Sequence, residues 1–386
     1  MKVAYISSVA FSDVDLSLLN RLQSKAEIDY YIQLYPNGLK GAAVNINCLF
    51  EGNGVFPHTI YPELDRISQK LNQTNVFAFN ATKNRLLSLA RIKAAIVLFN
   101  KLYKGQYDII HCTWFPDFTL LWLLLVFRKR LVFTIHDPIP HSSLKSKTQL
   151  LYRWLTMKIG KHFILLNTAQ TQEFIDYYRI DCNTQNIYYS KLGCYDYLGI
   201  YERGEIDTSR NKYILFFGKI FSYKGLKYLL PAMKIVNASY PNIKLIIAGS
   251  GQFEFDITEY KDQDYIEIRN RFIPEEELVE LIRGSLFIVA PYIDATQSGV
   301  VMSAYAFGKP CIATNVGALP EVVKNMKNGL LVEPQNIDQL AEAIIYLIAN
   351  ESLIVQFSQN IKNEYSLGIM SWECIADGIL NIYNQI

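Results

Sequence analysis

The stretch ILFFGKIFSYKG, residues 214–225, gives the clearest indication of how this chain folds. Its apolar residues predict a buried strand that ends at Gly218, and a helix is expected to open near Gly225. Glycine lets backbone approach a ligand closely, and the first amides of a helix attract phosphate. Lys219 and Lys224 bracket the loop. The pattern predicts an anion-binding strand–loop–helix unit, although a plain connection with two surface lysines would look the same.

Apolar, β-branched runs alternate with helical patterns on both sides of this stretch. The alternation predicts parallel sheets that helices cover on both faces. Strands are expected at residues 3–7, 28–34, 109–112, 131–135, 163–167, 213–218, 243–248, 266–269, 286–290, 311–314 and 329–332. Helices are expected at residues 226–238, 275–283 and 337–350.

A length of 386 residues exceeds one ordinary domain and fits two. The polar segment 201–211 has no periodicity, so we expect it to be the hinge. The expected fold class is α/β, with two doubly wound, Rossmann-like domains facing each other across a deep cleft. Their expected boundaries are residues 1–200 and 201–370.

The composition, 50% hydrophobic and 19% charged, indicates a globular protein with a large core. The six cysteines form no CxxC pair, so we expect reduced thiols, and neither disulfides nor a zinc site. The N-terminal apolar run is too short for a signal peptide. The longest apolar run, residues 120–127, is far shorter than the roughly 20 residues of a membrane span.

The net charge of +2 conceals an asymmetry along the chain. Residues 66–172 hold sixteen lysines and arginines but only three acids, a balance of +13, and the remainder has −11. A basic region attracts anionic lipid, nucleic acid or phosphorylated substrates, and the alternative is a solvated face with no partner. Residues 149–161 mix bases with leucine, tryptophan and tyrosine, which suits a membrane interface.

A second polar loop, residues 291–300, lies between an expected strand and a helix that runs to Phe307. Thr296, Gln297, Ser298 and Gly299 concentrate hydrogen-bonding groups and bare amides at the carboxyl end of that strand. This suits binding of an anion or a sugar. An ordinary helix N-terminus capped by Thr296 or Ser298 is the alternative, and both can hold together.

The first domain has its own polar group after the expected strand at 131–135, in His136, Asp137 and His141. A His–Asp pair can orient an imidazole for acid–base chemistry or bind hydroxyls. A histidine of purely structural role is the alternative.

Taken in order, these motifs resemble the retaining family 4 glycosyltransferases, which have the GT-B fold. Residues 213–332 keep the strand-Gly-Lys-loop-Lys-Gly unit, AGSG at 248–251, FIPE at 272–275, the Thr-Gln-Ser-Gly loop, and GKP at 308–310 followed by GALPE at 317–321. The resemblance extends weakly to the first domain, through residues 108–111 and the His-Asp pair. Each motif is weak alone, and five in order are strong.

The resemblance implies a role for each of these residues. Lys219, where many relatives have arginine, and Lys224 would grip the donor diphosphate next to Gly218, and Phe272 would lie near the nucleobase. His136 would contact the donor sugar or the acceptor, with Asp137 and His141 on the acceptor side. The final helix, within residues 371–386, would cross back to the first domain.

The chain departs from the family at its paired glutamates, whose positions fall at Ala295 and Ser303. It resembles a branch with a Thr-Gln-Ser-Gly loop, in which Gln297 and the amides of Ser298, Gly299 and Val300 would take over donor binding. Asp294 is one residue out of register and is a candidate substitute carboxylate. Ser303 remains among the expected donor contacts.

The implied reaction is retaining transfer of a hexose or N-acetylhexosamine from a nucleoside-diphosphate sugar, with UDP favoured. The expected acceptor is a hydroxyl of a lipid-diphosphate-linked sugar, in bacterial O-antigen or capsular polysaccharide synthesis. We expect no metal, no other cofactor and no nucleic-acid partner. The basic first domain is expected to place the protein on the cytoplasmic face of the cell membrane, as a peripheral protein.

Two alternatives share this fold and donor. A sugar-nucleotide 2-epimerase needs acid–base carboxylates, which the motifs do not supply. A non-catalytic sugar-nucleotide-binding subunit is suggested by Ala295 and Ser303. A dinucleotide dehydrogenase is excluded, because residues 7–13 read SSVAFSD where G-x-G-x-x-G would be needed.

Overall fold

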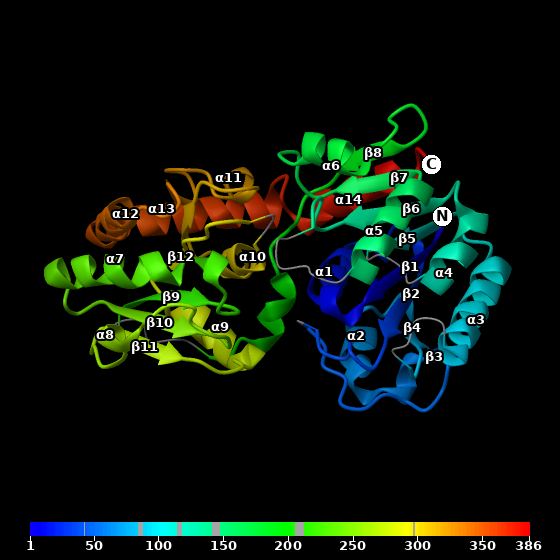
Figure 1. Cartoon of the computed structure of the whole chain (residues 1–386), viewed down its shortest axis with the longest axis horizontal. Coiled ribbons are helices and arrows are strands. Elements are labelled where there is room, and N and C mark those ends of the chain that lie inside the picture. The colour runs from blue at the N-terminus through cyan, green and yellow to red at the C-terminus, as the bar shows by residue number, and fades with distance from the viewer. Residues whose placement is uncertain (42, 84–87, 114–117, 141–146, 205–211, 296–297) are drawn as a thin grey trace. The chain divides into compact units, whose positions relative to one another are not determined.

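The computed structural model describes residues 1–386 except 42, 84–87, 114–117, 141–146, 205–211 and 296–297. The chain forms two compact units, and each contains one sheet (Figure 1). The N-terminal unit comprises Met1–Leu192 with Trp372–Ile386, and the C-terminal unit is Gly193–Ser371. Most of the predicted hinge, at 205–211, lies outside the described residues.

The N-terminal unit is built on an eight-stranded sheet of order β3-β4-β2-β1-β5-β6-β7-β8. Neighbouring strands are parallel except for β3, which runs antiparallel to β4 at one edge. The strands are β1 (Lys2–Ser8), β2 (Glu27–Leu34), β3 (Gly54–Pro57), β4 (Thr74–Asn80), β5 (Ile109–Cys112), β6 (Leu131–Ile135), β7 (His162–Leu165) and β8 (Asn186–Tyr189).

Helices cover both faces of this sheet. On one face, Ala4 and Ile6 of β1 share a core with Ala94 and Leu98 of α3. On the other, the Tyr5 hydroxyl donates to the Asp15 carboxylate of α1 at 3.0 Å. The helices are α1 (Ser12–Leu22), α2 (Asp65–Lys70), α3 (Leu89–Gly105), α4 (Phe118–Leu124), α5 (Lys147–Ile159) and α6 (Thr171–Tyr178).

The last helix, α14 (Trp372–Tyr383), belongs to the N-terminal unit and packs on α1 (Figure 1). Lys25 pairs with Glu373 and Asp377 of this helix, each at 2.5 Å. The Tyr383 hydroxyl bonds Nδ1 of the buried His111 on β5. The chain end therefore stabilises the sheet of the first unit, to which the resemblance assigned it.

The C-terminal unit has a six-stranded parallel sheet of order β11-β10-β9-β12-β13-β14. The strands are β9 (Tyr213–Phe217), β10 (Lys244–Ala248), β11 (Ile266–Arg269), β12 (Ile288–Ala290), β13 (Cys311–Thr314) and β14 (Gly329–Val332). The order runs one way from β9 to β11 and the other way from β12 to β14. The carboxyl ends of β9 and β12 therefore meet at the switch point of a doubly wound sheet.

The helices of this unit alternate with its strands, so both units are Rossmann-like. They are α7 (Leu226–Ser239), α8 (Thr258–Lys261), α9 (Glu275–Gly284), α10 (Gly299–Ala306), α11 (Leu319–Val322), α12 (Ile337–Ala349) and α13 (Glu351–Lys362). Within the described residues no single helix is long and apolar enough to span a membrane. Ile337–Ala349 and Glu351–Tyr383 satisfy those criteria only as a pair, with a 93° bend between them.

Candidate active site

Two loops meet at the switch point of the C-terminal sheet. The loop after β9 contains Gly218 and Lys219, and the loop after β12 leads from Pro291 to α10. The Ile293 amide donates to the Tyr223 carbonyl at 2.8 Å, so backbone joins the two loops directly. A Cβ on Gly218 would lie 3.3 Å from Cγ2 of Val300, which places the first turn of α10 beside the end of β9.

Two glycines make this close approach possible. Gly225 has φ +75°, and a Cβ there would lie 1.7 Å from the Pro291 carbonyl oxygen. Gly249 has φ +153°, and a Cβ there would lie 1.9 Å from the Gly218 carbonyl oxygen. No other residue fits either position without moving backbone, because both the space and the backbone angle exclude a side chain.

Lys224 is the half-buried cation of this site. Its Nζ lies 3.8 Å from the centroid of the Tyr292 ring and 5.2 Å from that of Tyr223. Burial lowers the pKa of the Lys224 ammonium to about 8, since removal from water disfavours the charged form. The ring faces stabilise the cation without neutralising it, and among the described residues no carboxylate pairs with it, so its charge is open to an anion.

Lys219 is exposed, in contrast to Lys224. It is one residue past Gly218, whose amide donates to the Ala248 carbonyl at 3.0 Å and ties this loop to the end of β10. A flexible, hydrated ammonium at this position can reach an anion without a fixed geometry. The structure therefore separates the predicted pair into one half-buried cation, Lys224, and one exposed cation, Lys219.

The N-terminus of α10 is capped by Ser298, as one reading of the loop predicted. The buried Ser298 Oγ accepts from the Val301 amide at 3.3 Å and donates to the Tyr292 hydroxyl at 3.2 Å. Helix geometry leaves the first amides, including those of Gly299 and Val300, without an intrahelical acceptor. Tyr292 thus connects this anion-attracting helix end to Lys224.

The remaining predicted donor residues differ in accessibility. Ala295 and Ser303, at the positions of the family's glutamates, are both buried, and Asp294 is exposed. Thr296 and Gln297 lie outside the described residues.

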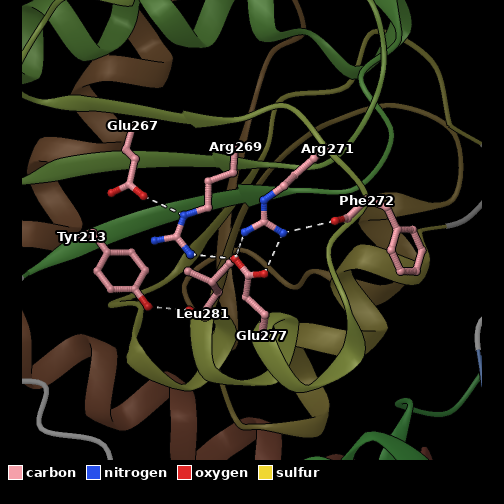
Figure 2. A network of polar contacts seen from close by, with 7 residues as sticks. All are labelled: Tyr213, Glu267, Arg269, Arg271, Phe272, Glu277 and Leu281. Atoms are coloured by element: carbon pink, nitrogen blue, oxygen red, sulfur yellow. Dashed lines mark hydrogen bonds and ion pairs between the residues drawn. The ribbon is translucent and has the colours of Figure 1, made fainter.

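Phe272 lies just past the carboxyl end of β11, and its side chain is 65% exposed. Figure 2 shows the ionic network beneath it, in which Arg269 and Arg271 both pair with Glu277 at the start of α9. The Arg271 guanidinium also donates to the Phe272 carbonyl at 3.2 Å. Sequence reasoning missed this network, although alternating charges at 267, 269 and 271 were its signal.

In the N-terminal unit, His136 follows β6 and stacks on Phe11, with ring centroids 4.1 Å apart. Its Nε2 is buried and has no hydrogen-bond partner in the described part of the chain. Burial lowers the pKa of the His136 imidazole to about 4, and the nearby Asp137 carboxylate opposes that shift. The imidazole of His136 is therefore neutral at physiological pH.

Arg153 holds the backbone next to His136. This buried arginine of α5 donates from Nη2 to the Asp137 carbonyl and from Nε to the Tyr178 hydroxyl, at 2.8 Å. Sequence reasoning missed both Arg153 and Phe11, because each is far from His136 in the chain. His141 lies outside the described residues.

Comparisons with known proteins agree with this architecture. Residues 202–364 match the family model described as glycosyl transferases group 1, and residues 50–188 match that of glycosyltransferase family 4. An uncharacterized glycosyltransferase of Methanocaldococcus jannaschii is 25% identical over 303 residues, covering 72% of this chain and 75% of the relative.

Two further relatives have more specific descriptions. The UDP-Gal:α-D-GlcNAc-diphosphoundecaprenol α-1,3-galactosyltransferase of Escherichia coli is 22% identical over 307 residues, covering 74% of this chain and 78% of the relative. The solved structure of Anabaena HepE with UDP-glucose has a TM-score of 0.68 at 15% identity and full coverage of both chains. With a group 1 domain and a family 4 domain on two Rossmann-like units, the chain is a glycosyltransferase of the GT-B fold.

Proposed function

We propose that this enzyme transfers a hexose or N-acetylhexosamine, with retention of configuration, from a UDP-sugar to a hydroxyl of a lipid-diphosphate-linked sugar. The observation that carries the donor assignment is the convergence of Lys224, Tyr292 and the α10 N-terminus at one switch point. A positioned cation beside helix amides suits a diphosphate.

The lysines and the helix amides act on the leaving group. Cleavage of the bond between the anomeric carbon and the phosphate oxygen places negative charge on the β-phosphate. Lys224, Lys219 and the amides of Gly299 and Val300 stabilise that charge more in the transition state than in the ground state. The proposal requires no metal ion, because these cations and dipoles neutralise the diphosphate.

The anomeric configuration is retained because the acceptor hydroxyl attacks the anomeric carbon on the same face from which the diphosphate leaves. The acceptor oxygen bonds the anomeric carbon as the phosphate oxygen leaves, and the acceptor's proton passes to that phosphate oxygen. Since Ala295 and Ser303 replace the family's glutamates, no carboxylate nucleophile is invoked. His136, which is neutral and whose Nε2 has no hydrogen-bond partner among the described residues, would contact a hydroxyl of the donor sugar or the acceptor.

Two neighbours support the choice of substrates. HepE binds UDP-glucose on the same fold, and the E. coli relative transfers galactose from UDP-galactose to a diphosphoundecaprenol-linked sugar. The basic charge of residues 66–172 is consistent with such an acceptor at an anionic membrane. We place the enzyme in bacterial O-antigen or capsular polysaccharide assembly, on the cytoplasmic face of the cell membrane.

The test begins with a thermal-shift screen of UDP, GDP and their sugars. A nucleotide at 100 times its Kd stabilises the fold by about 2.7 kcal/mol, so UDP should raise Tm while GDP at equal concentration should not. The best donor is then incubated with and without a short-chain prenyl-diphosphate sugar. Formation of an α-linked product from an α-linked donor supports the proposal. A 2-epimer formed from the donor alone would instead establish an epimerase.

A further inference from the structure

Three neighbouring helical segments on one face of the N-terminal sheet contain no acid, whereas α6, which packs on the same core cluster, carries the exposed Glu173 and Asp176. Residues 89–105, 118–130 and 147–161, which we call the acid-free helical surface, contain α3, α4 with the 3-10 helix η4 (Leu125–Phe127), and α5. They contain no aspartate or glutamate. Their eleven bases are Arg91, Lys93, Lys101, Lys104, Arg128, Lys129, Arg130, Lys147, Arg153, Lys158 and Lys161.

These segments lie side by side on the sheet. Their inner side chains, among them Leu98, Leu120 and Met157, belong to one core cluster. α3 packs on α4, and Arg128 after η4 donates from Nε to the Ile159 carbonyl at the end of α5, at 2.7 Å (Figure 1). The opposite sides of the three segments therefore form one outward layer.

The outward layer exposes large apolar side chains among its cations. Trp122 on α4 is 52% exposed, and Val126, four residues later on η4, is 64% exposed. Ile96 and Tyr103 are exposed on α3, and Trp154 on α5. Single exposed apolar residues are ordinary, but two tryptophans among bases match the side chains favoured where a bilayer meets water.

Charge alone would suit either a nucleic acid or a lipid headgroup. The aliphatic residues decide between them, because Val126 and Ile96 gain nothing from a phosphate backbone but gain burial among acyl chains. Lys93, Lys104 and Lys129 are exposed around them and can reach anionic headgroups.

We propose that the acid-free helical surface lies flat on an anionic bilayer, with Trp122 and Val126 inserted at the level of the headgroups. This inference rests on the proposed function only for its purpose, which is to bring the enzyme to a lipid-linked acceptor. It extends the interface that the sequence predicted at residues 149–161 to the neighbouring helices α3 and α4.

The first experiment measures flotation of the full chain with vesicles of phosphatidylcholine alone or with 30% phosphatidylglycerol, a proportion of about one in three chosen to give a strong surface potential. Binding should require the anionic lipid. The triple variant Lys93→Gln, Lys104→Gln, Lys129→Gln should lower partitioning about 100-fold, at about fivefold for each cation. The matched variant Lys234→Gln, Lys244→Gln, Lys261→Gln changes three exposed lysines of the other unit and should bind normally.

The second experiment tests insertion. Vesicles with brominated acyl chains should quench tryptophan fluorescence of the wild type, and Trp122→Phe should remove much of that quenching. Trp122→Ser with Val126→Ser should weaken flotation, whereas Ile235→Ser with Val355→Ser, which changes exposed apolar residues of the C-terminal unit, should not. Far-ultraviolet circular dichroism and UDP-induced thermal shifts confirm that each variant is folded.

Three outcomes would overturn the docking face: equal flotation of both triple variants, unchanged quenching in Trp122→Phe, or binding to single-stranded RNA but not to vesicles. A transfer assay with a water-soluble acceptor separates this inference from the proposed function. Vesicle binding without any sugar transfer leaves the docking face standing and removes the function. Sugar transfer by a protein that does not bind vesicles would support the proposed function and overturn the docking face.

Discussion

The ammonium nitrogen of Lys224 lies 3.8 Å from the centroid of the Tyr292 ring. Lys224 comes from the loop after β9 and Tyr292 from the loop after β12, so this contact joins the two strands between which the sheet order reverses. The same ring bonds Ser298, which caps α10. The cation and the helix end that would share a diphosphate are therefore held by one side chain.

Removal of this cation should remove catalysis and spare the fold. Lys224→Ala deletes a charge that acts on the leaving diphosphate, and loss of one such group costs about 100-fold or more in kcat. Steady-state transfer and Tm should be measured together, with the exposed Lys234→Ala as the control. Near-normal turnover in Lys224→Ala would remove the central claim of the proposed mechanism.

The pKa of Lys224 predicts a pH dependence of donor binding. Burial lowers this pKa from its ordinary value of 10.5 to about 8, and a bound diphosphate must raise it again because it favours the charged form. Binding therefore takes up a proton, so affinity is greatest below pH 8 and falls as the pH rises through 8. The Kd for UDP should rise towards about tenfold per pH unit above that value.

Lys224→Arg is the control for this titration, because arginine keeps its charge over the whole range. Isothermal titration of UDP between pH 6.5 and 9.5 should show a flat Kd for Lys224→Arg and a rising Kd for the wild type. If the two curves run parallel, another group governs the binding.

A methyl group at Gly249 should disrupt the donor site by displacing Gly218. The new Cβ would lie 1.9 Å from the Gly218 carbonyl oxygen, so Gly249→Ala must displace the end of β9. Loss of UDP binding and a lower Tm are expected. Gly378→Ala on α14 is the matched control, since a Cβ there meets nothing within 4 Å and should stabilise the helix by about 1 kcal/mol. A normal UDP affinity in Gly249→Ala would show that the loop tolerates the shift.

The donor-side core of the fold was predictable because its signals are local. The strand that ends at Gly218, the glycine turn and the opening of α7 are consecutive in the sequence. Predicted strands at 109–112, 131–135, 266–269, 311–314 and 329–332 have these bounds in the structure. Five motifs in a fixed order then carried the resemblance to a family with the GT-B fold, which no single motif did.

Strands β3, β4 and β8 were not predicted, because their apolar runs are only two to four residues long and polar residues or proline bound them. Strand β4 begins at Thr74 and ends at Asn80, two buried polar residues. The Asn80 side-chain amide donates to the carbonyls of Phe50 and Gly52, a partnership about 30 residues away that no periodicity shows. Strand β3 also breaks the expected all-parallel pattern, pairing antiparallel at the edge.

The surroundings of His136 were hidden for the same reason. Its stacking partner Phe11 lies between β1 and α1. Arg153, which donates to the carbonyl of Asp137, is on α5. A His-Asp dipeptide predicted a polar site but gave no protonation state. Burial in the fold lowers the pKa of the imidazole and so favours its neutral form.

Replacement of His136 by phenylalanine should lower the transfer rate and raise the free energy of unfolding. Its buried Nε2 has no partner in the described part of the chain, and an unmet buried polar atom costs about 1 to 3 kcal/mol. His136→Phe keeps a ring that stacks on Phe11 and removes the unpaired nitrogen. The free energy of unfolding, measured in urea, should therefore rise by this amount. Transfer should fall because a substrate hydroxyl loses its contact.

The pKa of His136 predicts how the transfer rate should depend on pH. Because burial lowers this pKa to about 4, the imidazole stays neutral between pH 5 and 8. The titration of His136 should therefore cause no change in the wild-type transfer rate near pH 6.5, and the pH profiles of the wild type and of His136→Phe should have the same shape. Arg153→Met should lower transfer as well, but by releasing the Asp137 carbonyl, and it should destabilise the fold. A His136→Phe variant that is less stable than the wild type, yet transfers sugar at the same rate, would assign His136 to the core and not to the substrate.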